Sequence, residues 1–310
     1  MAKSILDAPY FHDEEEARKY LEAIRWPSGP FCPHCGNVEK VYALAGESHR
    51  PGLYKCSACR KQFTVTVGTL FERSKVPLHK WLTAVYLMCA SKKSMSSHQL
   101  HRMMGVTYKT AWFMTHRIRE AMKDPMFTRQ LGGAARIVEA DETFWGNTKR
   151  KRGTPGRGYH HKEKIFSLVE RGGDVRSFHV PSVSAKTLKP IMQEQIAQDT
   201  AIVTDEMSSY NGTEKMFRSH DTVTHGAGEY VRGQIHTNTI ENYFSLVKRA
   251  LVGTYHHVAP RHLRRYIGEF DFRYNNRKVD DSARMNAALC GIDGKRLMYR
   301  DSATRALHNR

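Results

Sequence analysis

The chain has 310 residues, enough for more than one domain, since domains typically hold about 100–200 residues. Its 49 lysines and arginines outnumber its 31 aspartates and glutamates, giving a net charge of +18, which favours a polyanionic partner, nucleic acid before an anionic membrane surface. No apolar run approaches the roughly 20 residues of a membrane span and the N-terminal segment has no apolar signal core, which predicts a soluble, intracellular protein without a membrane partner.

The first quarter of the chain combines a helix with two cysteine pairs. Residues 1–30 are predicted to form an N-terminal helical segment, acidic around Asp13 to Ile24 and closed by the turn-forming RWPSGP. Residues 31–75 follow, with the β-favouring segments VYAL, LYKC and QFTVTV around two CxxC turns. Short strands are therefore expected around the cysteines.

The two CxxC pairs have the spacing of a zinc ribbon, with twenty residues between them. Four thiolates can complete one closed tetrahedral site: Cys32, Cys35, Cys56 and Cys59. Disulfides would need an oxidising compartment, and a redox CxxC would not explain two pairs. His34 lies inside the first turn, but four cysteines already satisfy the ion. We predict a structural Zn²⁺ that leaves no position for water and performs no chemistry.

Residues 76–130 are predicted to form three helices that end in a helix-turn-helix-like pair. Ser96 or Ser97 can cap the second helix, Gly105 can end it, and Thr107 can cap the third. The third helix would turn polar residues toward a DNA groove: Tyr108, Lys109, His116, Arg117 and Arg119. The alternative is a three-helix unit that serves only as a packing module.

Residues 131–280 are predicted to form a mixed α/β domain. The strand-like runs ARIVEADETFW, KIFSLVE and VRSFHV come first. A helical segment near Ala185 to Ala197 then precedes the strand-like AIVTDE, and helices follow from about His236. Strands followed by alternating helices and strands fit a mixed sheet covered by helices. Residues 281–310 are assigned to a C-terminal tail.

Two carboxylates on predicted strands are candidate ligands for catalytic metal ions. Asp141 ends a run that can form a central strand, where a charge is costly unless it binds metal. Asp205 closes a short apolar strand before a turn, a common place for functional groups in α/β sheets. Cleavage of a phosphodiester by two ions needs carboxylates from separate elements. Glu139 and Glu142 are alternatives to Asp141, and Glu206 is the alternative to Asp205.

A third carboxylate lies on a predicted amphipathic helix in HTNTIENYFSLVKRALVG. The apolar stripe of this helix consists of Ile240, Tyr243, Phe244, Val247 and Leu251. Glu241 lies off the stripe and shares a face with Asn238, Ser245 and Lys248. Glu241 and Lys248 can therefore approach the same metal site and DNA phosphate.

Thirty-five residues separate Asp205 from Glu241, and Lys248 follows Glu241 by seven. This arrangement resembles the DDE transposases and retroviral-type integrases. Further motifs are RWPSGPFCPHCG, CSACRKQFTVTVGTLF, VEADETFWGN, TDEMSSYNG and IENYFSLVKRALVGTYHHVAPRHLRRYIGEFDFRYNNR. With these motifs, the chain is similar to the zinc-ribbon group of bacterial insertion-sequence transposases over roughly residues 10–277.

The resemblance implies a DNA transposase whose RNase H-like catalytic domain follows a small zinc ribbon and a helix-turn-helix-like unit. Asp141, Asp205 and Glu241 would hold two Mg²⁺ or Mn²⁺ ions, and Lys248 would position DNA. Because members of this group vary at the last acid, Asn242 is an alternative third ligand, although a carboxylate binds Mg²⁺ better than an amide. The implied partners are the terminal inverted repeats of the element, target DNA and a second copy of the chain, in the bacterial cytoplasm at the nucleoid.

Two other functions remain open: a structure-specific nuclease of the same fold, and a DNA-binding regulator without catalysis. In each case, basic residues would contact phosphates. The segment TKRKRGTPGRGYHHKEK follows the Asp141 strand and is either a DNA-contacting loop or a solvated run of charge. The residues expected to contact DNA are Lys149, Arg150, Lys151 and Arg152 in this segment, and Lys109, Arg117 and Arg249 elsewhere.

Overall fold

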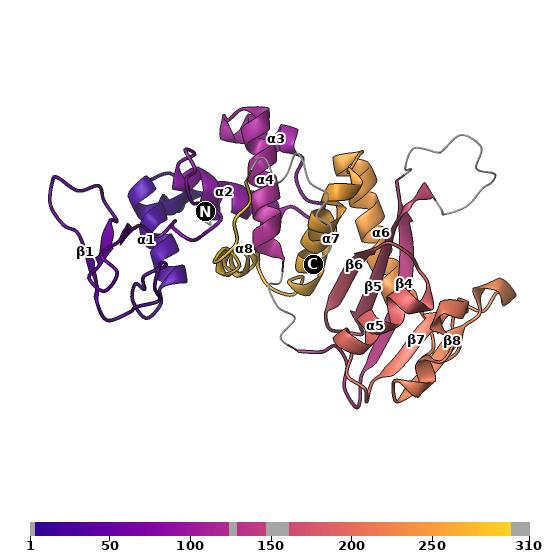
Figure 1. Ribbon diagram of the computed structural model, residues 1–310. Helices are drawn as coiled ribbons and strands as arrows, with labels where there is room; N and C mark the ends of the chain where they lie inside the picture. Colours follow the sequence, from indigo (N-terminus) through magenta and orange to yellow (C-terminus); the bar gives the residue numbers. More distant parts are fainter. Residues whose placement is uncertain (1–3, 124–128, 147–160, 299–310) are drawn as a thin grey trace. The chain divides into compact units, whose positions relative to one another are not determined.

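The computed structural model describes residues 4–123, 129–146 and 161–298. The chain divides into two compact units (Figure 1). Unit 1 combines residues 1–123 with residues 279–310, and unit 2 consists of residues 124–278. None of the helices within the described ranges has the length and apolarity that crossing a lipid bilayer requires.

Unit 1 begins with a helix and a small antiparallel sheet. The helix α1 (Glu14–Arg25) starts where the Asp13 carboxylate accepts the Glu16 N–H, an ordinary N-cap. Three short strands follow and pair in chain order: β1 (Val41–Ala43), β2 (Tyr54–Cys56) and β3 (Gln62–Phe63). The ring of Trp26 packs edge-on against Tyr54 and Phe63, which gives this small sheet an aromatic core.

Four further α-helices lie in the described part of unit 1: α2 (Leu78–Ala90), α3 (Ser97–Met104), α4 (Tyr108–Met122) and α8 (Asp281–Cys290). The side chains of Ser96 and Thr107 cap α3 and α4, and Gly105 ends α3 in the left-handed conformation with φ 61°. The helix α8 packs against α1, α2 and α4. Residues 281–290, expected to be part of a tail, therefore form an integral helix of this unit.

Unit 2 is built on a five-stranded mixed sheet. Its strands are β4 (Ile137–Trp145), β5 (Glu163–Glu170), β6 (Val175–Val180), β7 (Ala201–Asp205) and β8 (Ser219–Val223). The spatial order is β6-β5-β4-β7-β8; neighbours among the first three are antiparallel, whereas β7 is parallel to β4 and β8 to β7. This is the mixed sheet that the sequence predicts, in agreement with the RNase H-like fold that the family resemblance implies. The polar edge strand β8 is an addition to that prediction.

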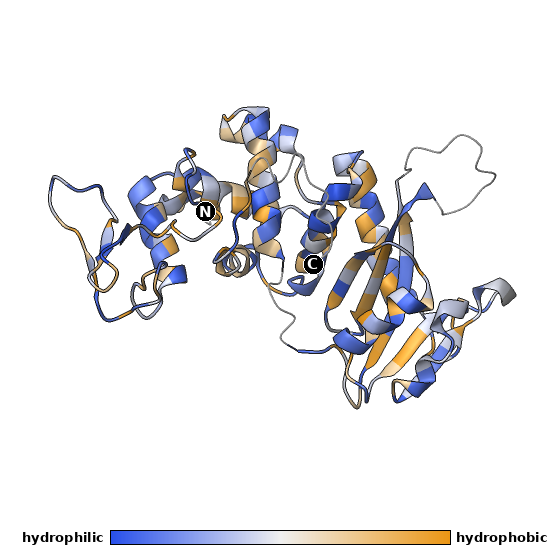
Figure 2. Cartoon of the chain, viewed as in Figure 1, coloured by the Kyte–Doolittle hydropathy of each residue, from blue (hydrophilic) through white to orange (hydrophobic). Residues whose placement is uncertain are grey.

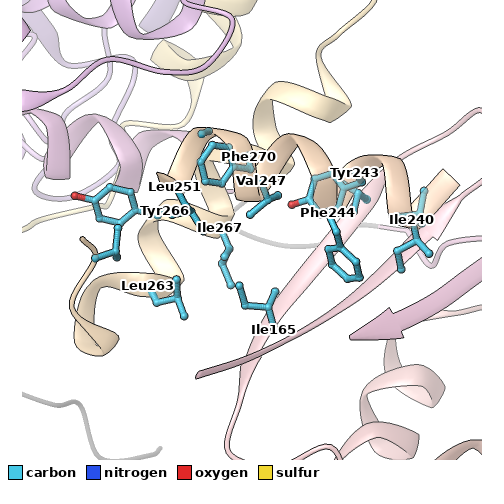
Figure 3. Packing of buried hydrophobic residues seen from close by; sticks show 14 residues of the cluster. Ile165, Ile240, Tyr243, Phe244, Val247, Leu251, Leu263, Tyr266, Ile267 and Phe270 are labelled. Atoms are coloured by element: carbon cyan, nitrogen blue, oxygen red, sulfur yellow. The ribbon is translucent and has the colours of Figure 1, made fainter. Parts of the chain in front are cut away.

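Helices cover both faces of the sheet: α5 (Ala185–Gln195) on one side, and α6 (Asn238–Ala250) and α7 (Pro260–Asn275) on the other (Figure 1). The strands between them are largely hydrophobic (Figure 2). On the second side, the apolar stripe of α6 packs with α7 and with Ile165 of β5 (Figure 3). Since all five residues predicted for this stripe are buried, the stripe prediction is confirmed. Short 3-10 turns lie at Ser208–Tyr210, Thr213–Lys215 and His225–Ala227.

Candidate active site and zinc site

Asp141 and Asp205 lie side by side on adjacent parallel strands. The pairing of β4 with β7 sets Glu139 opposite Val203, and each aspartate follows two residues later on its strand. Because side chains alternate along a strand, both aspartates leave the sheet on the face that α6 covers. Carboxylate oxygens of Asp141, Asp205 and the neighbouring Glu142 lie within 4.8 Å of one another. The fold thus brings together two of the three carboxylates expected from the sequence.

Crowding and burial keep these carboxyl groups protonated to unusually high pH. Desolvation, together with the charge of Glu142, raises the pKa of Asp141 to about 8; Asp205 and Glu241 add to the shift, and only the Glu142 N–H opposes it. Desolvation also raises the pKa of Glu142 to about 7 and raises that of Asp205. These carboxyl groups repel one another when ionised, and a bound divalent cation would offset that repulsion. Clustered carboxylate oxygens are also the ligands that hard cations such as Mg²⁺ or Mn²⁺ prefer.

Glu142 is held at the edge of this cluster by a tyrosine. The Tyr210 hydroxyl donates to Glu142 Oε2 at 2.7 Å, and burial raises the pKa of Tyr210 well above its ordinary value. The sequence offers Glu142 only as an alternative to Asp141, whereas the structure places both residues in one cluster. The adjacent DE pair in VEADETFW was the available signal, but strand alternation alone would send neighbouring side chains to opposite faces.

Glu241 lies at the start of α6, half-exposed, and its charge reaches Asp141. Its Oε1 accepts the Thr237 hydroxyl at 2.8 Å and lies 3.5 Å from His225 Nε2. Its side chain therefore borders the three-carboxylate cluster without being part of it. The neighbouring Asn242 is also exposed on α6.

The other two candidate carboxylates fix the backbone around the site. Glu139 is fully buried and receives Arg171 Nε at 2.6 Å and the Ile240 backbone N–H at 2.9 Å. Glu206 receives the backbone N–H groups of His225 and Gly226, each at 2.9 Å. These contacts give both glutamates structural positions and leave Asp141 and Asp205 as the strand carboxylates that meet.

Lys248 and Arg249 lie farther along α6, both exposed. Lys248 lies on the same helix face as Glu241, two turns away, because residues spaced by seven share a face. Arg249 Nε donates to the Ser245 carbonyl. This face of α6 thus presents a carboxylate at the border of the cluster and a cation two turns farther along the helix.

The four cysteines of unit 1 converge in a second, separate cluster. The Sγ atoms of Cys32 and Cys59 lie 3.6 Å apart, and those of Cys35 and Cys56 lie 3.7 Å apart. Sulfurs around a tetrahedral zinc, with bonds of about 2.3 Å, lie about 3.8 Å apart. The Cys59 backbone N–H favours the Cys56 thiolate and lowers its pKa to about 7. The donor set therefore fits a structural zinc.

Two family models match the chain: a transposase zinc-ribbon domain over residues 12–62 and an ISXO2-like transposase domain over residues 130–275. A protein encoded in the transposable element ISH50 of Halobacterium salinarum is 31% identical over 280 residues, covering 85% of this chain and 91% of that protein. The chain belongs to the ISXO2-like transposase family. An uncharacterised transposase-like protein of Haemophilus influenzae is 28% identical over 118 residues, which is 38% of this chain and 86% of that protein.

Among solved structures, this transposase family member aligns with a chain of the Mos1 strand transfer complex. The alignment covers 67% of the present chain and 73% of the Mos1 chain. The sequence identity is 14% and the TM-score is 0.27.

The zinc-ribbon match includes all four cysteines, and the ISXO2-like match includes Asp141, Asp205 and Glu241.

The residues expected to contact DNA differ in their surroundings in this transposase. Lys109 is exposed near the start of α4, as a DNA contact requires. Arg117 is partly buried, and its guanidinium donates to the Leu297 carbonyl and lies over the Phe113 ring. His116 and Arg119 are fully buried, so the expectation that they face a groove is wrong. Lys149, Arg150, Lys151 and Arg152 lie outside the described residues.

Proposed function

We propose that this transposase family member cleaves DNA at the ends of its insertion sequence and joins the released 3′ ends to target DNA. The observation that carries the proposal is the meeting of Asp141 and Asp205 on adjacent strands of the transposase domain. Its partners would be terminal inverted repeats, target DNA and a second copy of the chain. Such substrates place its action in the cytoplasm, at the nucleoid.

In this proposal, Asp141 and Asp205 hold two divalent ions, and Glu241 completes the ligand set. Two bound ions activate the attacking oxygen and stabilise the leaving oxygen of a phosphodiester. Glu241 reaches the site by turning away from Thr237 and His225, to which it is held at 2.8 and 3.5 Å. Asn242 is the alternative ligand from the same helix. Glu142, held by Tyr210, adds a fourth carboxylate close to both aspartates.

The remaining residues in the proposal position DNA. Lys248 follows Glu241 by two helical turns and would pair with a phosphate next to the one being cleaved. Arg249 extends the positive charge of this helix face, and Lys109 of α4 would contact phosphates from unit 1. The zinc ribbon would serve as a folded binding module, since a closed site of four cysteines leaves no open position for a reacting group.

The proposal is tested by incubating the purified protein with duplexes that carry the element's terminal repeat, in Mg²⁺ or Mn²⁺, with supercoiled plasmid as target. We expect nicking at the repeat end and covalent transfer of the 3′ end into the plasmid. Hydrolysis of the duplex without any joined product would identify a nuclease instead. Binding of the repeat without cleavage in either metal would identify a DNA-binding regulator.

A further inference from the structure

A hollow of about 580 Å³ lies in unit 2 between the end of β4 and the C-terminal part of α6. Its apolar wall includes Trp145, Val252, Val258 and Pro260. Lys248, His256 and His257 also line it, and all three are exposed. Its volume falls within the range of about 300–1,000 Å³ that is usual for pockets that bind small ligands. An apolar slot with a lysine and two imidazoles at its margin matches a nucleotide, which has a flat apolar base and an anionic phosphate.

The backbone that forms one wall of this hollow is strained. The α6 helix continues into a π-helical turn over Leu251–Tyr255, and His256 follows with φ 56° and ψ −44°. The His257 N–H then bonds to the Tyr255 carbonyl at 2.5 Å, which closes a tight three-residue turn. A residue with a side chain rarely adopts this conformation, and such strain concentrates at ligand-binding sites. Here it holds two imidazoles at the edge of the hollow.

The hollow also lies at a suitable distance from the carboxylate cluster. Trp145 follows Asp141 by four residues on β4, so both leave the same face of the strand about 13 Å apart. A B-form strand rises by about 3.4 Å per nucleotide along the helix axis, so this span corresponds to roughly four nucleotides measured along that axis, and to fewer in an extended strand. Lys248 belongs to the helix face of Glu241 and lines the hollow as well. A DNA strand at the carboxylates would thus continue past this opening.

We propose that this hollow, called here the Trp145 pocket, takes one unpaired nucleotide of the DNA strand that is cut. The base would stack on Trp145, and its phosphate would lie against Lys248 and the two histidines. A paired base cannot enter, because its faces are stacked within the duplex, so the nucleotide must leave the helix first. The lining carboxylate Glu163 is engaged by His179 Nε2 at 2.6 Å, which reduces its repulsion of a phosphate. The inference rests on the proposed function, since it assumes that the strand passes the carboxylates.

The test places 2-aminopurine singly at each position near the cleavage site of a terminal-repeat duplex and binds the duplex to the full chain in Ca²⁺. We expect one position whose fluorescence departs from the duplex value with wild-type protein. Trp145→Phe keeps an aromatic surface and should retain this signal. Trp145→Ala should change it, and Val252→Trp, which fills the hollow from an exposed position, should abolish it. Leu246→Trp is the matched control, because Leu246 is exposed on the same helix but does not line the hollow.

Cleavage in Mg²⁺ provides the second measurement. Loss of one stacked base should slow Trp145→Ala by roughly 5- to 150-fold. An abasic nucleotide at the responsive position should slow the wild type by a similar factor and leave Trp145→Ala no slower, since both changes remove one contact. Because Trp145 also packs against the core, Val252→Trp provides a test that removes no core contact.

If no position responds and both Trp145→Ala and Val252→Trp cleave like the wild type, the Trp145 pocket does not bind a nucleotide, while the proposed function stands. If the wild type cleaves no duplex in Mg²⁺ or Mn²⁺, the proposed function fails. The fluorescence measurement in Ca²⁺ needs no cleavage, so it decides on the pocket in either case.

Discussion

The buried carboxylate of Glu139 accepts the backbone N–H of Ile240 at 2.9 Å and so joins the strand of Asp141 to the helix of Glu241. The Thr239 hydroxyl donates to the same carboxylate. Glu139 therefore accepts hydrogen bonds from two donors in the first turn of α6, where backbone N–H groups have no partner within the helix. Arg171 completes the link: it bonds to Glu139 and to the backbone carbonyls of Gln234 and His236, just before the helix. The relative position of two proposed metal ligands thus depends on one buried ion pair.

Replacing Glu139 should weaken both the fold and the proposed catalysis. We expect Glu139→Gln to lower the free energy of unfolding by about 1–3 kcal/mol, because the Arg171 guanidinium loses its charged partner. The half-saturating Mn²⁺ concentration for cleavage should rise as α6 loses its anchor. Urea unfolding and a Mn²⁺ titration measure the two effects. Glu194→Gln, an exposed change on α5, is the control, and equal stability of the two variants would contradict the anchoring role.

The carboxylate cluster should make the metal-free protein less stable as the pH rises. The folded-state pKa of Asp141 is about 8, above the ordinary value of 3.8, so the folded state retains a proton that the unfolded chain releases. The contribution of the Asp141 carboxyl group to the stability of the folded state is therefore fully present below about pH 4 and is lost as the pH rises through about 8. Asp141→Asn cannot ionise and therefore avoids this loss of stability at high pH. At pH 8 without divalent ions, the variant should be more stable than the wild type by about 1–2 kcal/mol.

Thermal unfolding at pH 5 and pH 8, with and without Mg²⁺, checks this prediction. Mg²⁺ should stabilise the wild type more at pH 8 than at pH 5, since protons compete with the ion for the carboxylates. Asp141→Asn should respond weakly to Mg²⁺, and Asp199→Asn, an exposed change, should behave like the wild type. An Asp141→Asn variant that is less stable than the wild type at pH 8 would contradict the cluster's electrostatics.

Removal of zinc should unfold the ribbon and spare unit 2. The short strands β1, β2 and β3 enclose a small aromatic core, so the metal supplies much of their stability. After chelation, or in Cys56→Ser, amide hydrogen exchange should become fast across residues 31–75 and remain slow in β4 and β5. Protection of residues 31–75 that survives chelation would show that the cysteines have no structural metal to lose.

Two basic residues of α4 should respond oppositely to replacement by alanine. Lys109→Ala should lower DNA affinity and reduce the salt dependence of binding by about one phosphate contact, with little change in stability. Arg117→Ala should destabilise unit 1, since its guanidinium bonds to the Leu297 carbonyl and lies 4.7 Å from the Phe113 ring centroid. Fluorescence anisotropy at several salt concentrations, paired with urea unfolding, separates the two effects. Equal stability of the two variants would count against the structural role of Arg117.

Much of this structure was predictable because its signals are local. The cysteine spacing marks the ribbon, and the caps at Ser96 and Thr107 mark the starts of α3 and α4 within a residue. The apolar stripe of α6 is visible as a periodicity. The strand β8 is not predictable in this way, because its sequence SHDTV is polar and gives no apolar run. Its place is set by pairing with β7, a contact between distant segments.

Side-chain roles were harder to predict, since they depend on partners far along the chain. Glu139 and Asp141 look alike within one strand, and only Arg171 and the start of α6 distinguish a structural carboxylate from a candidate metal ligand. Likewise, Arg119 lies on a basic helix but is fully buried, since α4 packs against α2, α3 and α8. The meeting of Asp141 and Asp205 is easier to anticipate, because both lie in apolar runs that form strands of the same sheet, Asp141 within β4 and Asp205 at the end of β7.

The central claim, that Asp141 and Asp205 hold the catalytic ions, is tested most directly with Asp205→Asn. The substitution keeps the side chain's shape and its position on β7 but removes the charge that binds metal. The account predicts that Asp205→Asn binds a terminal-repeat duplex as tightly as the wild type while cleaving it roughly a thousandfold more slowly or worse in Mg²⁺. Cleavage and strand transfer by Asp205→Asn at the wild-type rate would contradict the claim.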